Sequence, residues 1–88
     1  MLKIIDEPGF LREWKKLEKK HYDYSKIRRV VLMLASRERL PPSYRDHAIG
    51  GEWRGFRECH IEPNWLLIYF LTEDSVVLAR TGTHDDLF

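Results

Sequence analysis

Hydrophobic and polar positions along the chain change period in a way that predicts one strand, two helices and three further strands. Residues 1–6 are mostly apolar and are followed by a Glu-Pro-Gly break, which predicts a short first strand. Residues 10–21 carry an apolar face at spacings of four, three and four, as one side of a helix requires. This face consists of Phe10, Trp14, Leu17 and His21. We expect His21 to pack at the end of this helix rather than to take part in chemistry.

A second helix is predicted between a turn and a pair of prolines. Residues 23–25 suit a turn and a helix N-cap, because short polar side chains accept hydrogen bonds from the free N–H groups of a first turn. The buried side follows at helical spacing and consists of Ile27, Val30, Val31, Leu34 and Ala35. Pro41 and Pro42 are expected to end the helix after Leu40. Two such helices with a short link predict an antiparallel hairpin packed on one face of a sheet.

Three runs with strand character follow a connector at residues 41–52. The runs comprise residues 53–60, 65–72 and 75–83. Turns of a few residues separate them, which predicts an antiparallel meander. The order is β-α-α-β-β-β, so the predicted fold is one α+β domain over residues 1–88, a two-helix hairpin on a mainly antiparallel sheet. The connector carries Arg45 and His47 and is either a functional loop or a plain surface loop.

Charge is distributed unevenly along a chain whose formal net charge is only +1. Residues 1–57 hold 14 Lys and Arg against 8 Asp and Glu, whereas residues 58–88 hold Arg80 alone against 6 acidic residues. The basic excess is concentrated in residues 12–39, which form either a solvated helical face or a surface for a polyanion or an acidic protein. With no membrane-length apolar run and no signal peptide in the sequence, we expect a cytoplasmic protein without membrane contact.

Three histidines lie among aromatic and basic residues in the second half of the chain: His47, His60 and His84. Imidazole titrates nearest to neutral pH and can accept or donate a proton under working conditions. Metal binding is disfavoured, because there is no His-x-x-x-His pair and the only cysteine stands alone. Cys59 is expected to be a packed thiol, since the adjacent His60 points to the opposite face of the strand. We therefore expect no metal and no cofactor.

Acid–base cleavage of RNA suits these residues better than metal binding or catalysis by Cys59. RNA carries its own nucleophile, the 2′-hydroxyl, so an enzyme needs a base for that hydroxyl, an acid for the leaving 5′-oxygen and a cation for the phosphate. Two imidazoles and a guanidinium supply these groups without a metal. Trp65 and Phe88 are candidates for stacking on bases. Each has a structural alternative, because Trp65 opens an apolar strand and Phe88 can dock as a tail.

Two segments with distinctive motifs resemble a known family. In residues 46–69 an Asp-His pair precedes the run Gly-Gly-Glu-Trp-Arg-Gly-Phe-Arg-Glu-Cys-His-Ile-Glu-Pro, and residues 80–88 read Arg-Thr-Gly-Thr-His-Asp-Asp-Leu-Phe. Together with the order of elements, they resemble the YafQ branch of the RelE/ParE toxin superfamily over nearly the whole chain. The specific likeness lies in residues 46–88, and the helices match only in pattern.

The resemblance implies the toxin of a type II toxin–antitoxin system, a ribosome-dependent endoribonuclease that cuts mRNA in the A site by 2′-hydroxyl attack. The implied partners are the 70S ribosome with mRNA, an acidic antitoxin of the ribbon-helix-helix type, and operator DNA only through the antitoxin complex. The family's site residues fall on His47, His60 and His84, on the aromatic residues Trp65 and Phe88, on the possible acid Glu58 and on the phosphate contact Arg80. We expect His60 near the 2′-hydroxyl and His84 near the leaving oxygen.

One position departs from the family pattern, in which an acidic residue follows Glu-Pro. Asn64 stands there in this chain, and an amide cannot act as a carboxylate base, although it can still hydrogen-bond to RNA. Three alternatives follow: the chain cleaves RNA more slowly, it uses the carboxylate of Glu58 or Glu62 instead, or it is a weakened toxin. Two other functions stay open: a poison that binds its target without cutting, as in the gyrase-targeting branch, and an inactive RNA-binding module.

Overall fold

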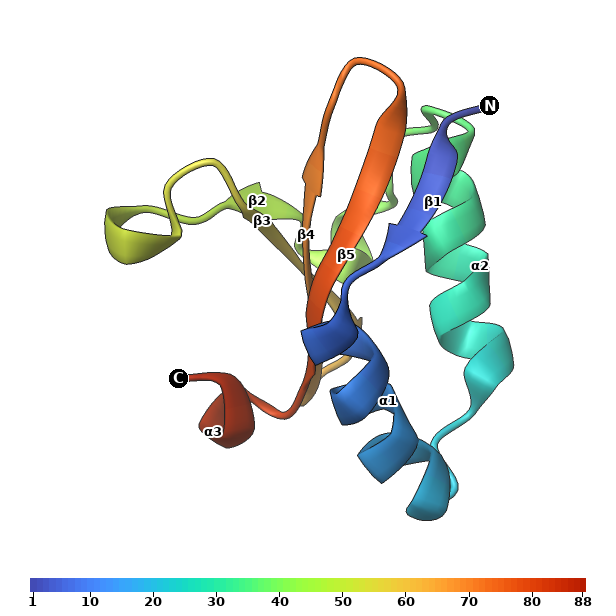
Figure 1. Ribbon diagram of the computed structural model, residues 1–88, viewed down its shortest axis with the longest axis vertical. Helices are drawn as coiled ribbons and strands as arrows, with labels where there is room; N and C mark the ends of the chain where they lie inside the picture. Colours follow the sequence, from blue (N-terminus) through green and yellow to red (C-terminus); the bar gives the residue numbers. More distant parts are fainter.

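One five-stranded sheet organises the computed structural model, which describes residues 1–88 (Figure 1). The strands are β1 (Lys3–Asp6), β2 (His47–Ala48), β3 (Arg57–Glu62), β4 (Trp65–Leu71) and β5 (Ser75–Gly82). They stand in the order β1-β5-β4-β3-β2. β1 runs parallel to β5, and every other pair of neighbours is antiparallel. The predicted α+β fold with a mainly antiparallel sheet is therefore confirmed.

Two helices, α1 (Pro8–Lys19) and α2 (Tyr24–Ala35), cover one face of the sheet as the predicted hairpin (Figure 1). α1 begins with a proline, whose missing N–H costs nothing in the first turn. The Asp23 carboxylate caps α2, as expected, by accepting from the Ser25 N–H at 2.9 Å. Neither helix is long and apolar enough to cross a membrane.

Both helices end earlier than the apolar pattern predicts, because a residue in the left-handed conformation follows each of them. Arg37 has a φ of 60° and turns the chain after α2, before the two prolines are reached. His21 has a φ of 65° and makes the turn between the helices with its side chain in solvent. The prediction that His21 packs at the helix end is wrong.

β4 and β5 lie at the centre of the core because both of their faces are covered. The larger apolar cluster, which includes Trp65, Leu67 and Tyr69, lies between the sheet and the helices α1 and α2. A smaller cluster on the opposite face consists of Leu66, Ile68, Ala79 and Leu87. This burial on two sides explains why β4 has a continuous apolar run instead of alternation.

The connector differs most from the prediction. It contains β2, which pairs with β3, and two 3₁₀ turns at Pro42–Tyr44 and Gly51–Trp53. β3 begins at Arg57 instead of residue 53, because Gly51 and Gly55 have φ angles of 63° and 94° and curl this segment away from the sheet. A third helix, α3 (His84–Leu87), was not predicted and is capped by the Thr83 side chain, which accepts from the Asp86 N–H.

The single thiol lies inside the core, as expected for a packed cysteine. Cys59 is 0% exposed, and burial raises the pKa of its thiol far above the usual value. We therefore expect the folded protein to react with Ellman's reagent more than about tenfold more slowly than the protein unfolded in urea. Stopped-flow absorbance in the two conditions measures the ratio. Equal rates would mean that Cys59 is accessible in the folded state.

Candidate active site

Two rows of paired residues cross the sheet on the face opposite α1 and α2. The first row consists of His47, Glu58, Ile68 and Arg80. The second row consists of His60, Leu66 and Gly82. Residues paired across antiparallel strands point to the same face, so the polar members of both rows share one surface above the smaller apolar cluster. The sheet therefore gathers residues from four strands that are distant in sequence.

Glu58 is the shared partner of two histidines. Its Oε1 lies 3.3 Å from Nε2 of His60, and its Oε2 lies 4.0 Å from Nε2 of His47. The Glu58 side chain is only 11% exposed, so the imidazoles replace much of the water around its carboxylate. Either ring, when protonated, forms an ion pair with Glu58. The structure thus brings together His47, His60 and Glu58, three of the predicted site residues.

Backbone carbonyls determine which ring nitrogen of each histidine can exchange a proton. Nδ1 of His47 lies 2.6 Å from the Arg45 oxygen, and Nδ1 of His60 lies 3.2 Å from the Pro63 oxygen. A carbonyl oxygen only accepts hydrogen bonds, so both Nδ1 atoms carry hydrogen. In each ring Nε2 is then the atom that gains or loses a proton, and it is the atom that faces Glu58.

His84 stands at the start of α3, just past the end of the second row. Its backbone N–H donates to Oδ1 of Asn64 at 3.2 Å, and its ring centroid lies 5.3 Å from that of Phe88. Asn64 therefore anchors α3, a role that its amide oxygen fulfils without a charge. No hydrogen bond or ion pair joins His84 to the other two histidines or to Glu58.

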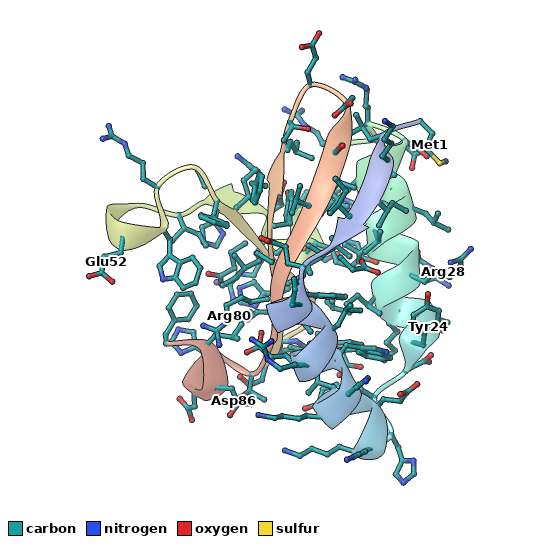
Figure 2. All side chains as sticks on the ribbon, in the orientation of Figure 1. Met1, Tyr24, Arg28, Glu52, Arg80 and Asp86 are labelled. Carbon is teal, nitrogen blue, oxygen red and sulfur yellow. The ribbon has the colours of Figure 1, made fainter.

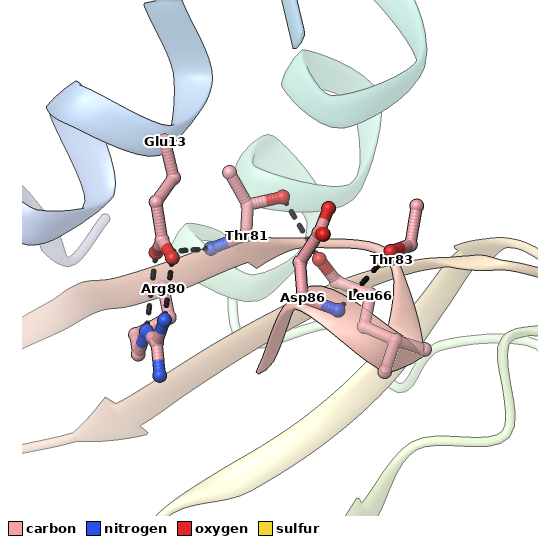
Figure 3. Close-up of polar contacts among 6 residues, drawn as sticks. All are labelled: Glu13, Leu66, Arg80, Thr81, Thr83 and Asp86. Carbon is pink, nitrogen blue, oxygen red and sulfur yellow. Dashed lines mark hydrogen bonds and ion pairs between the residues drawn. The ribbon is translucent and has the colours of Figure 1, made fainter. Parts of the chain in front are cut away.

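Arg80 is held by a residue that was not predicted, Glu13 of α1 (Figure 3). The Arg80 Nε and Nη2 atoms donate to the Glu13 carboxylate at 3.2 and 2.6 Å, and the Thr81 N–H donates to the same group at 3.3 Å. The hydrogen bond to Glu13 raises the pKa of the guanidinium. Nη1 of Arg80 makes no hydrogen bond, and the predicted contact between Arg80 and phosphate stays a prediction.

Trp65 does not lie on the surface of the site. Its ring is buried against Trp14 at a centroid distance of 6.1 Å, and its indole N–H donates to the Thr81 hydroxyl at 2.9 Å. A nucleobase cannot reach it, so the prediction that Trp65 stacks on RNA is wrong and its structural alternative applies. Phe88, which lies beside His84 and is 50% exposed, is in edge contact with Trp53 at a centroid distance of 6.1 Å.

A polar cluster on the helix side of the sheet fixes the loop that carries His47. Asp46 accepts from the Tyr69 hydroxyl at 2.5 Å and from Nη2 of Arg57 at 3.2 Å. Burial and the bond to Asp46 raise the pKa of Tyr69, so its hydroxyl stays a donor. Because Asp46 precedes His47, this anchor holds the start of β2 beside β3. The Asp-His motif indicated the pair, but the partners of Asp46 were not foreseen.

Comparison with known proteins places this arrangement in a family. A family model for the bacterial toxin of a type II toxin–antitoxin system, YafQ, matches residues 2–88. The chain belongs to the YafQ family of bacterial toxins. The resemblance drawn from residues 46–88 is thereby confirmed, and so is its first implication, the toxin of a toxin–antitoxin system.

Solved structures and a curated relative agree with the YafQ assignment. The chain is 39% identical over 80 residues to the mRNA interferase toxin YafQ of Escherichia coli, with 90% of this chain and 87% of that protein covered. A copper-bound mutant toxin from Helicobacter pylori matches with a TM-score of 0.96 and 40% identity, over the full length of both chains. A chain of the E. coli DinJ-YafQ complex matches with a TM-score of 0.91 and 36% identity, covering 100% of this chain and 99% of that one.

The matching mutant toxin from Helicobacter pylori is copper-bound. No group of three or more His, Cys, Asp or Glu side chains here is placed to hold a metal ion. The expectation of cleavage without a metal or cofactor stays a prediction.

Replacing Glu13 with alanine is expected to lower the free energy of unfolding by about 1.5–3 kcal/mol, the range for hydrogen bonds that involve a charged group. The change removes both acceptors of Arg80 and the acceptor of the Thr81 N–H. Urea unfolding followed by tryptophan fluorescence measures it. Glu18→Ala, an exposed position on α1 without an ion pair, is the control and should cost less than about 0.5 kcal/mol. Equal losses would contradict the assigned role of Glu13.

Proposed function

We propose that this YafQ-family chain is an endoribonuclease that cuts mRNA in the A site of the ribosome, with a 2′,3′-cyclic phosphate and a 5′-hydroxyl as products. The observation that carries the proposal is the Glu58 carboxylate between Nε2 of His47 and Nε2 of His60. This arrangement supports proton transfer at neutral pH. The E. coli relative is named an mRNA interferase, a class of endoribonuclease, which agrees with that chemistry.

The reaction needs one proton removed and one supplied. Neutral His60 takes the 2′-hydroxyl proton on Nε2, and the freed oxygen attacks phosphorus. The bond between phosphorus and the 5′-oxygen breaks, and protonated His84 gives that oxygen its proton. Glu58 stabilises the imidazolium formed at His60, because its Oε1 lies 3.3 Å from the atom that receives the proton. The proton balance is closed without a metal.

The remaining groups of the site bind the nucleotide around the scissile linkage. In this proposal Nη1 of Arg80 and, when charged, His47 contact nonbridging phosphate oxygens, which their shared position on the first row supports. Phe88 is exposed and stacks against a base, the role that Trp65 cannot fill. Asn64 is exposed beside His84 and keeps its amide N–H groups free for RNA. Trp53 holds Phe88 in place through an edge contact.

The ribosome and an antitoxin complete the proposal. The 70S ribosome holds mRNA in the A site, and residues 12–39, with their basic excess, dock against ribosomal RNA. Such a substrate places the toxin in the cytoplasm. A cognate antitoxin, acidic and of the ribbon-helix-helix type, neutralises it, and the complex contacts operator DNA through the antitoxin. The solved DinJ-YafQ complex supports an antitoxin partner.

Removing either proposed proton-transfer group is expected to slow cleavage by about 100-fold or more. Programmed ribosomes are incubated with wild type, His60→Ala or His84→Ala, and cuts are mapped by primer extension. Glu73→Ala is the control, because the Glu73 side chain is exposed in the turn between β4 and β5 and forms no ion pair. The absence of cuts with wild type would reject the nuclease, and DNA breaks on induction would indicate a gyrase-type poison. An equal loss in Glu73→Ala would reject the assigned roles.

Glu58→Gln is expected to lower the cleavage rate by at least about tenfold, because it keeps the shape of the side chain but removes the charge that holds the imidazolium. Glu62→Gln is the matched control, since its carboxylate pairs with Lys26 of α2 and with neither histidine. Single-turnover rates on the same ribosomes measure both. A larger loss in Glu62→Gln would make Glu62 the acid that replaces the family's carboxylate at Asn64.

A further inference from the structure

The half of β5 that extends beyond β1 carries a groove along its edge. β1 pairs with β5 only as far as Leu78, so residues 79–82 border α1 instead of another strand. Two cavities of about 270 and 390 Å³ adjoin there and share Glu13, Lys16 and Arg80. In Figure 2, Arg80 and Asp86 lie on this side of the molecule, whereas Tyr24 and Arg28 lie on α2, on the other side of α1.

The wall that α1 contributes to the groove is basic. Arg12, Lys16 and Lys20 recur at every fourth position and therefore form one line, with a rise of about 6 Å between neighbours. None of the three forms an ion pair, and the charge of Glu13 is offset by Arg80. Asp86 is the only lining carboxylate without an ion pair. A line of unpaired cations favours a chain of regularly spaced anions.

The groove is continuous with the candidate active site through Arg80. This residue lines both cavities and also ends the first row, which contains Glu58 and His47. An RNA strand whose phosphate contacts Nη1 of Arg80 therefore continues along α1. We propose that the groove binds the phosphate backbone of the substrate RNA next to the scissile linkage, an inference that rests on the proposed function.

An amphipathic protein helix fits the groove less well than a nucleic-acid backbone. Such a helix needs an apolar floor, and Leu17 and Ala79 are the only apolar side chains that line the two cavities. The larger apolar cavity, between α1, α2 and β1, lies elsewhere and is lined by Phe10, Trp14 and Ile27 among others. Phosphates need only cations, which the α1 line supplies.

Two pairs of lysines on α1 provide a matched test. Lys16→Gln with Lys20→Gln removes two groove cations, whereas Lys15→Gln with Lys19→Gln removes the same charge from positions outside the groove. The probe is a fluorescein-labelled RNA of about 12 nucleotides with 2′-O-methyl groups throughout, which 2′-hydroxyl attack cannot cleave. Anisotropy gives Kd over a range of salt concentrations, and circular dichroism checks that both variants are folded.

The groove pair is expected to weaken binding and to reduce the slope of log Kd against log salt by about 1.4, or 0.7 for each lost contact to single-stranded phosphate. The control pair lies outside the groove and should reduce the slope by less than the groove pair does. Equal slopes for the two variants, or no salt-dependent binding by wild type, would overturn the inference. Loss of antitoxin neutralisation in the groove pair with unchanged RNA binding would instead assign the groove to an acidic protein. Wild-type cleavage on ribosomes is scored separately, so failure of the nuclease is distinguishable from failure of the groove.

Discussion

The early end of β1 is the constraint on which the functional half of the molecule depends. Beyond Leu78, the outer edge of β5 has no strand partner, and an open edge exposes unpaired backbone groups. α1 occupies this edge, and Glu13 accepts the Thr81 N–H that a longer β1 would have bonded. The same carboxylate holds two nitrogens of Arg80. One acidic side chain therefore closes the sheet edge and fixes the direction of the Arg80 guanidinium (Figure 3).

A largely buried carboxylate at Glu58 imposes the second constraint. Burying a charge is costly unless partners compensate it, and two imidazoles approach this one from β2 and from β3 itself. Each imidazole is restrained on its other side by a backbone carbonyl, so only the Nε2 atoms can exchange protons. Asp46, held by Tyr69 and Arg57 from the helix side, keeps β2 close enough for this contact. The position of both imidazoles beside Glu58 thus depends on the packing of the strands that carry them.

The sequence predicted those features that repeat along it. Helical spacing found α1 and α2, and alternation placed His60 on the face of its strand opposite Cys59. The pairing of His47 with Glu58 could not be predicted, because a strand of two residues shows no periodic pattern. The role of Glu13 could not be predicted either, since its partner Arg80 lies 67 positions away. The prediction for Trp65 was wrong for another reason. An aromatic residue at the start of an apolar strand has the same local pattern whether it faces the core or a ligand.

Asn64 replaces the acidic residue of the family motif, and this replacement changes the fold less than it changes the motif. A side-chain oxygen is needed there to accept the His84 N–H, and an amide supplies one as well as a carboxylate does. What the chain lacks at this position is a negative charge near the rings. Glu58 supplies such a charge at 3.3 Å from His60. The geometry that orients His84 and the charge that supports His60 therefore come from different residues, and a change at Asn64 acts on the first without removing the second.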